Sequence, residues 1–97
     1  MAKLGGNVLA VIKVYPEGDS VDLNAIREQA EKVMPPGHRI GKVEEEEMAF
    51  GLKCLVFYVI MPEQTEGGTD SVEKALSAIT GVGRVETDVV TRYRPGH

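Results

Sequence analysis

The chain has 97 residues, of which 42% are apolar and 27% charged, and its formal net charge is −4. This length fits one domain, residues 1–97, and the single cysteine excludes an intramolecular disulfide and a four-cysteine zinc site. The negative charge disfavours nucleic acid as a partner, and no apolar run nears the ~20 residues of a membrane span. At the start of the chain, Met1–Asn7 lacks the apolar core of a signal peptide, so we expect a cytoplasmic protein.

The first half of the chain predicts a central strand followed by a helix. Val8–Val14 is largely apolar on both faces, as is typical of a strand with neighbours on both sides. The turn-forming residues Pro16–Asp19 end this strand. Asp22 is a predicted N-cap, and Pro35–Gly37 ends a helix whose apolar stripe consists of Leu23, Ile26, Ala30 and Val33.

Two strands joined by a short turn follow the helix. Ile40–Met48 is polar and predicts an edge strand, whose glutamates at residues 44–47 would resist aggregation through that edge. Leu52–Met61 is strongly apolar and rich in β-forming residues, which indicates a central strand. The short turn predicts an antiparallel hairpin with Phe50 and Gly51 at its tip.

The last third of the chain predicts a second helix and a fourth strand. Gly81 and Gly83 close a helix that Thr69 or Asp70 caps, and the apolar stripe of this helix is Val72, Ala75, Leu76 and Ile79. Val85–Tyr93 alternates in the manner of a strand. The order β-α-β-β-α-β predicts an α+β fold of the ferredoxin-like type, a four-stranded antiparallel sheet with two helices on one face.

The residues give little support to catalysis or to metal binding. His38 and His97 come with no recognisable nucleophile or orienting partner, and Glu17 and Asp19 after the first strand would repel a phosphate. Alternate glutamates within residues 44–47 lie about 7 Å apart on one strand face, too far to chelate one ion unaided. We therefore expect no catalytic residue, no metal and no cofactor.

Two regions are candidates for contact with a partner protein. Phe50 either packs against the hairpin or is exposed as an anchor, and Gly51 would let another backbone come close. An RNA-binding aromatic motif is excluded by the four acidic residues before Phe50. The carboxyl end carries Arg84, Arg92 and Arg94, which form either a frayed basic tail or a cation that enters an anionic site of a partner.

Several short motifs carry a resemblance to a known family. They are Val11–Val14 with Pro16, Ala49–Lys53 at the start of the third strand, Glu66–Thr69 and Val85–Val89. With these motifs in this order, essentially the whole chain resembles the archaeal elongation factor 1-beta family, the guanine-nucleotide exchange factors of elongation factor 1-alpha. The most specific motif is Ala49–Lys53, which contains Phe-Gly-Leu-Lys.

The resemblance implies an exchange domain that contacts the nucleotide-binding domain of elongation factor 1-alpha and promotes GDP release without bond chemistry. It implies partner contacts at Phe50, Gly51 and Lys53, and a near-terminal basic residue at Arg94 or at its neighbour Arg92. The family has lysine at this basic position, so arginine is a departure. We expect a monomer when free. The alternative is a small-ligand-sensing module that forms a homodimer by pairing through its edge strands.

Overall fold

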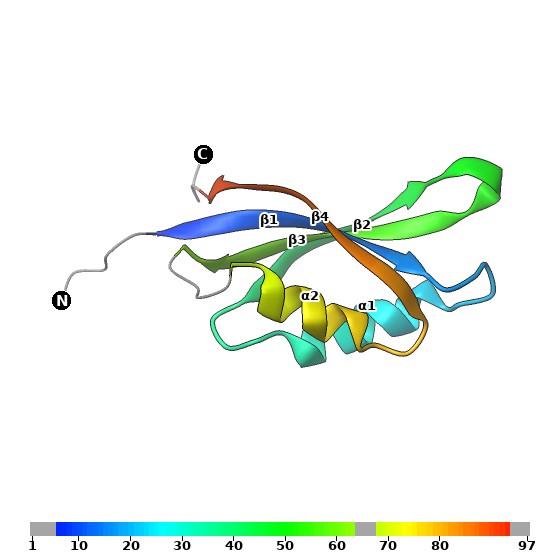
Figure 1. Cartoon of the computed structure of the whole chain (residues 1–97), viewed down its shortest axis with the longest axis horizontal. Helices are drawn as coiled ribbons and strands as arrows, with labels where there is room; N and C mark the ends of the chain where they lie inside the picture. Colours follow the sequence, from blue (N-terminus) through cyan, green and yellow to red (C-terminus); the bar gives the residue numbers. More distant parts are fainter. Residues whose placement is uncertain (1–5, 64–67, 94–97) are drawn as a thin grey trace.

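The computed structural model describes residues 6–63 and 68–93. Within them the elements in chain order are β1 (Asn7–Pro16), α1 (Leu23–Val33), β2 (Arg39–Glu47), the short turn η1 (Ala49–Gly51), β3 (Lys53–Pro62), α2 (Asp70–Ser77) and β4 (Val82–Tyr93). The strands form an antiparallel sheet in the order β2-β3-β1-β4, and both helices cover the same face of it (Figure 1). The ferredoxin-like α+β prediction is therefore confirmed, with β1 and β3 central and β2 at an edge.

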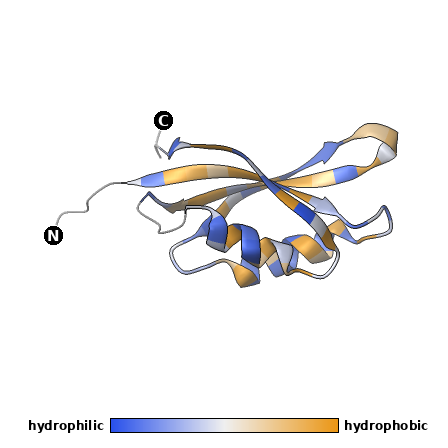
Figure 2. Cartoon of the chain, in the orientation of Figure 1, coloured by the Kyte–Doolittle hydropathy of each residue, from blue (hydrophilic) through white to orange (hydrophobic). Residues whose placement is uncertain are grey.

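The core lies between the sheet and the two helices because apolar residues alternate along the central strands. These strands supply Ala10, Ile12, Val14, Leu55, Phe57 and Val59, all fully buried. The predicted helix stripes supply Ile26, Ala30, Val72 and Leu76. Figure 2 shows hydrophobic stretches along β1 and on both helices, where they alternate with hydrophilic ones. Full burial of each large apolar side chain contributes about 1.5–3 kcal/mol, so these stripes hold the two layers together.

Both helices begin where the sequence predicts. The Asp22 carboxylate accepts a hydrogen bond from the Asn24 N–H at 3.0 Å, as an N-cap does. Thr69 occupies the N-cap of α2, but its hydroxyl donates to Glu73 at 3.0 Å instead of accepting from the backbone. The Thr87 hydroxyl donates to the same Glu73 carboxylate from β4. These bonds tie the first turn of α2 to the sheet.

The alternation predicted for the last strand is wrong beyond its middle, because a bulge interrupts it. Val11 of β1 pairs with Val89. The next β1 residue, Ile12, pairs with Thr87, which leaves Asp88 as an extra residue in β4. Directly paired residues share a face of the sheet, so the two halves of β4 present opposite alternations.

The connection from α2 to β4 differs from the prediction in two details. β4 begins at Val82 and not at Val85, and Gly83 therefore lies inside the strand and does not close the helix. Gly81, with φ at +98°, does not cap α2 either, because the C-cap is Ala78 and Gly81 lies three residues further on, in the turn before β4. A Cβ built on Gly83 would lie 3.1 Å from the Glu17 Cα, so glycine at this position lets β4 pass close to the β1–α1 loop.

We expect Gly81→Ala to destabilise the protein by about 2 kcal/mol or more. Alanine at a positive φ costs roughly 1–2 kcal/mol, and a Cβ on Gly81 would lie 2.9 Å from the Val21 Cγ1. Urea unfolding followed by circular dichroism measures the change. The matched control is Gly18→Ala, whose Cβ would meet no atom within 4 Å and which should change stability by at most about 1 kcal/mol. Equal effects of the two substitutions would contradict this account.

Candidate partner-binding site

The β2–β3 hairpin turns through two consecutive residues in the left-handed region. Phe50 has φ 64° and ψ 29°, and Gly51 has φ 74°. The Leu52 N–H donates to the Ala49 carbonyl at 3.3 Å, and the Met48 N–H donates to the Leu52 carbonyl at 2.7 Å. Positive φ at both central residues is the condition of a type I′ turn, whose first central position usually holds Asn, Asp or Gly.

The end of this hairpin is apolar and exposed. The Phe50 residue is 97% exposed, and Met48 and Leu52 are 38% and 39% exposed. We call these three residues the apolar tip; Figure 2 shows the hydrophobic end of the hairpin projecting beyond the helices. Of the two interpretations of Phe50 that the sequence left open, the structure excludes packing against the core.

Phe50 costs the isolated chain free energy in two ways. The left-handed backbone costs a residue with a Cβ roughly 1–2 kcal/mol. The exposed ring also forgoes the roughly 1.5–3 kcal/mol that burial of a phenylalanine contributes. Backbone strain at an exposed aromatic residue serves no purpose in the fold and is typical of a functional contact.

Gly51 and Lys53, the other two residues predicted at this site, are both exposed. A Cβ on Gly51 would meet no atom within 4 Å, so only its positive φ restricts this position in the free chain. The Lys53 Nζ lies 3.7 Å from a Glu45 carboxylate oxygen, and Arg27 lies 3.5 Å from the other oxygen. Exposed ion pairs contribute at most about 1 kcal/mol, so Lys53 can exchange Glu45 for an external carboxylate.

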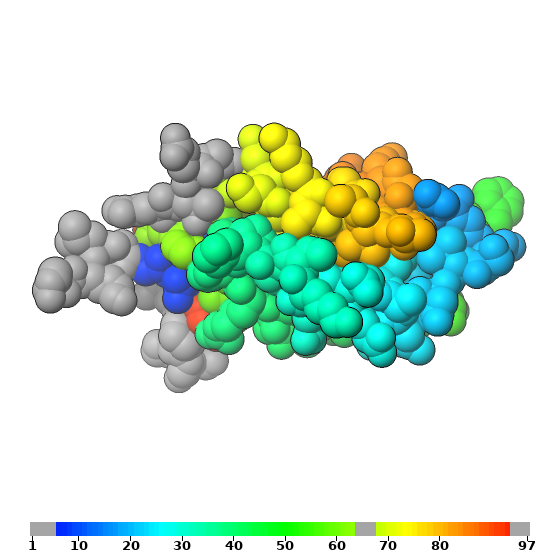
Figure 3. Space-filling model, turned by 90° about the horizontal axis from the view of Figure 1, so that it is seen from below, coloured from blue at the N-terminus to red at the C-terminus, as the bar shows by residue number. Residues whose placement is uncertain are grey.

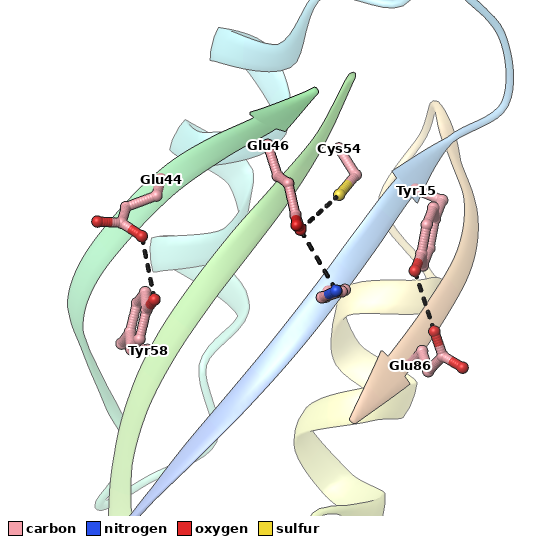
Figure 4. Close-up of polar contacts among 7 residues, drawn as sticks. Tyr15, Glu44, Glu46, Cys54, Tyr58 and Glu86 are labelled. Carbon is pink, nitrogen blue, oxygen red and sulfur yellow. Dashed lines mark hydrogen bonds and ion pairs between the residues drawn. The ribbon is translucent and has the colours of Figure 1, made fainter. Parts of the chain in front are cut away.

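The glutamate run of β2 is divided between the two faces of the strand. On the open face of the sheet, Glu44 accepts a hydrogen bond from the Tyr58 hydroxyl at 3.0 Å (Figure 4), and this bond lowers the pKa of Glu44. Glu46 accepts from the Cys54 thiol at 3.9 Å and ion-pairs with Lys13 at 3.3 Å. Glu45, which lies between them in the strand, contacts Arg27 of α1 instead. These carboxylates make separate cross-strand contacts, and across residues 6–63 and 68–93 no group of three or more His, Cys, Asp or Glu could hold a metal.

Arg84 lies apart from Arg92 in the structure. Its guanidinium lies 4.3 Å from the centroid of the Tyr15 ring, and the Tyr15 hydroxyl donates to Glu86 at 3.0 Å (Figure 4). Desolvation, together with the bond to Glu86, raises the pKa of Tyr15. Arg84 and Arg92 are near opposite ends of β4, so they form no common basic surface.

Arg92 is held by a carboxylate at the other end of the sheet. Its two terminal nitrogens donate to the two oxygens of Glu63 at 3.2 and 3.1 Å, in the bidentate geometry of strong arginine pairs. The Gly6 N–H donates to the same carboxylate at 3.2 Å, so the three residues join the ends of β1, β3 and β4. We call this set the strand-end clamp. Arg94, the other basic candidate, lies outside the described residues.

Phe50 and Arg92 lie at opposite ends of the molecule. Arg92 pairs with Val8 of β1, whereas Leu55 of β3 pairs with Val14. Six residues of strand separate these rows, which is about 20 Å, and the hairpin extends further beyond Leu55 (Figure 1). The structure therefore brings together Phe50, Gly51 and Lys53 at one end and places Arg92 in a second, separate location.

Comparison with known proteins identifies the family of this chain. The family model described as the EF-1 guanine nucleotide exchange domain matches residues 9–93. The chain belongs to this family. Among the relatives named elongation factor 1-beta, that of Metallosphaera sedula is 46% identical over 86 residues, which cover 89% of this chain and 94% of the relative. The relative of Sulfolobus acidocaldarius is 45% identical, with 89% and 96% covered, and that of Staphylothermus marinus is 42% identical, with 88% and 94% covered. The resemblance seen in the sequence is confirmed.

Two members of the apolar tip do not stand out in the sequence as site residues. The sequence pattern of this exchange domain places Met48 and Leu52 in the flanking strands, yet both lie beside Phe50 on an exposed surface. The available signal was the presence of apolar residues at positions 48, 50 and 52 around a predicted turn, where a core does not need them. Neither helix in the described part of the exchange domain is long and apolar enough to cross a membrane.

We expect the strand-end clamp to stabilise the exchange domain in a pH-dependent way. The Gly6 N–H bond, with the charge of Arg92, lowers the pKa of Glu63 from its ordinary value of 4.5. A lowered folded-state pKa contributes stability above the ordinary value and loses it as the pH falls through the lowered value. The melting temperature of wild type should therefore exceed that of Glu63→Gln near neutral pH, and the gap should close in acid.

The matched control for this titration is Glu28→Gln, which removes the charge of an exposed glutamate on α1. It should show no comparable gap at neutral pH. A Glu63→Gln gap that is the same at neutral and acid pH would show that the carboxylate charge contributes nothing.

Proposed function

We propose that this chain is the guanine-nucleotide exchange factor of elongation factor 1-alpha, promoting GDP release so that GTP can rebind during translation elongation. Membership of the EF-1 exchange domain family supports this proposal. The observation that carries the proposed site is Phe50, an exposed aromatic residue on a strained turn. An aromatic anchor of this kind is typical of the centre of a protein–protein interface.

At the hairpin end, the apolar tip would enter the nucleotide-binding domain of the partner. Burial of the Phe50 ring would recover the free energy that its exposure forgoes in the isolated chain. Gly51 carries no side chain, so a partner backbone can approach the turn closely. Lys53 would offer its ammonium to a partner carboxylate, because its exposed pair with Glu45 is weak.

Arg92, at the opposite end, and Arg94, which lies outside the described residues, are the candidates for the nucleotide site. GDP is held by contacts to its phosphates and to magnesium, and a cation placed near the metal would compete with it for the same anionic ligands. Arg92 would have to leave Glu63 to do so, whereas Arg94 lies two residues further along the chain. A contact at both ends requires a partner surface that extends at least about 20 Å.

Exchange of this kind needs no bond chemistry. A factor that weakens nucleotide binding to the GTPase is itself bound more weakly, to the same degree, when the nucleotide is present. It therefore accelerates exchange of either nucleotide, and the GTP-to-GDP ratio decides which nucleotide returns. In this proposal residues 1–97 act as one exchange domain in the cytoplasm, monomeric when free and without direct contact to nucleic acid or membrane. Family membership does not favour the ligand-sensing homodimer.

The proposal is tested by stopped-flow release of fluorescent GDP from archaeal elongation factor 1-alpha. Substoichiometric amounts of this chain should accelerate release, with each molecule acting on many copies of the partner. An active partner whose GDP release is unchanged at every concentration of the chain would refute the function.

A further inference from the structure

The loop between β1 and α1 lies beside the apolar tip. Figures 1 and 3 show the two segments together at the same end of the molecule. They enclose a hollow of about 270 Å3, whose lining includes Pro16, Val21, Leu23 and Leu52 together with Asp19 and Lys53. The hollow therefore combines apolar walls with charged side chains, directly beside the Phe50 turn.

The loop is a fixed part of this hollow. The Glu17 N–H donates to the Gly81 carbonyl at 2.8 Å, which fastens the loop to the start of β4. Gly83 provides the space for this approach, as its missing Cβ shows. Asp19 lies two residues beyond this anchored position, which limits the ordering that the loop requires when a partner binds.

The charges of the hollow differ in whether they are satisfied within the chain. The positive charge of Lys53 is balanced in the free chain by Glu45, although this exposed pair is weak. Asp19, which lines the hollow, and Glu17, which lies outside its lining on the same loop, are exposed, and within the described residues no ion pair includes either of them. The charge at the hollow that has no partner within the described residues is therefore negative, and the walls next to it are apolar.

We propose that this hollow receives a lysine or arginine side chain of the GTPase partner, its aliphatic stem packed on Val21, Leu23 and Leu52 and its cationic head paired with Asp19. A long basic side chain is the residue type that joins an apolar stem to a cationic end. This inference rests on the proposed function, and it adds that the partner carries a cation next to the pocket that takes Phe50. Glu17 strengthens the local negative potential and so favours the encounter.

The test compares Asp19→Asn and Asp19→Lys with wild type in the GDP-release assay, at increasing partner concentration and at low and high salt. The half-saturating partner concentration should rise about 3-fold for Asp19→Asn and about 10-fold for Asp19→Lys, while the maximal release rate stays within about 2-fold. The differences should shrink at high salt, because a rim charge is screened. Matched controls are Asp88→Asn and Asp88→Lys, which make the same charge changes on the open face of the sheet and should have no such effect.

The outcomes distinguish a failure of the exchange function from a failure of the basic-residue assignment. A wild-type chain that never accelerates release refutes the function itself. Wild-type acceleration with identical behaviour of the Asp19 and Asp88 variants overturns only the basic-residue assignment. Salt-sensitive self-association of wild type that Asp19→Lys abolishes, seen by sedimentation, would show that a second copy occupies the hollow and would also overturn it. Thermal unfolding of each variant establishes that it is folded.

Discussion

Replacing Phe50 with glycine should stabilise the free protein and impair its exchange activity at the same time. Glycine removes the roughly 1–2 kcal/mol of left-handed strain. Its greater backbone freedom in the unfolded chain offsets roughly 0.5–1 kcal/mol of this gain. The net gain lies between about 0 and 1.5 kcal/mol, and its central value of about 0.75 kcal/mol corresponds to a rise in melting temperature of about 3–6 °C for a domain of this size. Loss of a central aromatic anchor costs about 2 kcal/mol of binding, so exchange efficiency should fall about 30-fold.

The control for this prediction is Phe50→Ala, which removes the ring and keeps a Cβ at positive φ. It should impair exchange as strongly as the glycine variant but leave the melting temperature close to that of wild type. A Phe50→Gly variant with wild-type exchange would show that the apolar tip has no part in the function. A glycine variant that melts lower than Phe50→Ala would contradict the assignment of strain.

The second phenylalanine should behave in the opposite way. Phe57 is fully buried in the centre of β3, and Phe57→Ala should destabilise the protein by about 3–5 kcal/mol through lost burial and a cavity. This is a large part of the about 5–15 kcal/mol that holds a typical domain folded. Chemical unfolding at low temperature measures it, with Phe50→Ala as the matched exposed substitution.

Exchange activity provides the complementary measurement for Phe57→Ala. Because the substitution is remote from the tip surface, each molecule that remains folded should accelerate GDP release as wild type does. Comparable destabilisation by Phe57→Ala and Phe50→Ala would contradict the burial of the one ring and the exposure of the other.

The fold was predictable because its signals are local and repeated. Apolar residues recur at helical spacing in both helices, and the central strands are apolar on both faces, which orders them relative to the polar β2 edge. The bulge at Asp88 was not predictable in the same way. It depends on how β4 pairs with β1, and the residues around it, Thr87 and Val89, suit either face of a strand.

The candidate site was predictable in residue type but not in geometry. A phenylalanine before a glycine can fold back onto the sheet or project outwards, and only the three-dimensional structure, in which Phe50 is almost fully exposed, decides between them. The pairing of Arg92 with Glu63 joins residues 29 positions apart, and it follows from strand register and not from local sequence. The separation of Phe50 and Arg92 along the sheet likewise required the topology.

The most direct test of the central claim, that Phe50 is the partner-binding anchor, is 19F NMR on the chain labelled with fluorophenylalanine. The chain has two phenylalanines, so Phe57 is an internal reference within the core. On addition of GDP-bound elongation factor 1-alpha, the Phe50 resonance should shift and broaden while the Phe57 resonance keeps its position. A complex that forms by sedimentation while the Phe50 resonance remains that of a solvent-exposed ring would contradict the account.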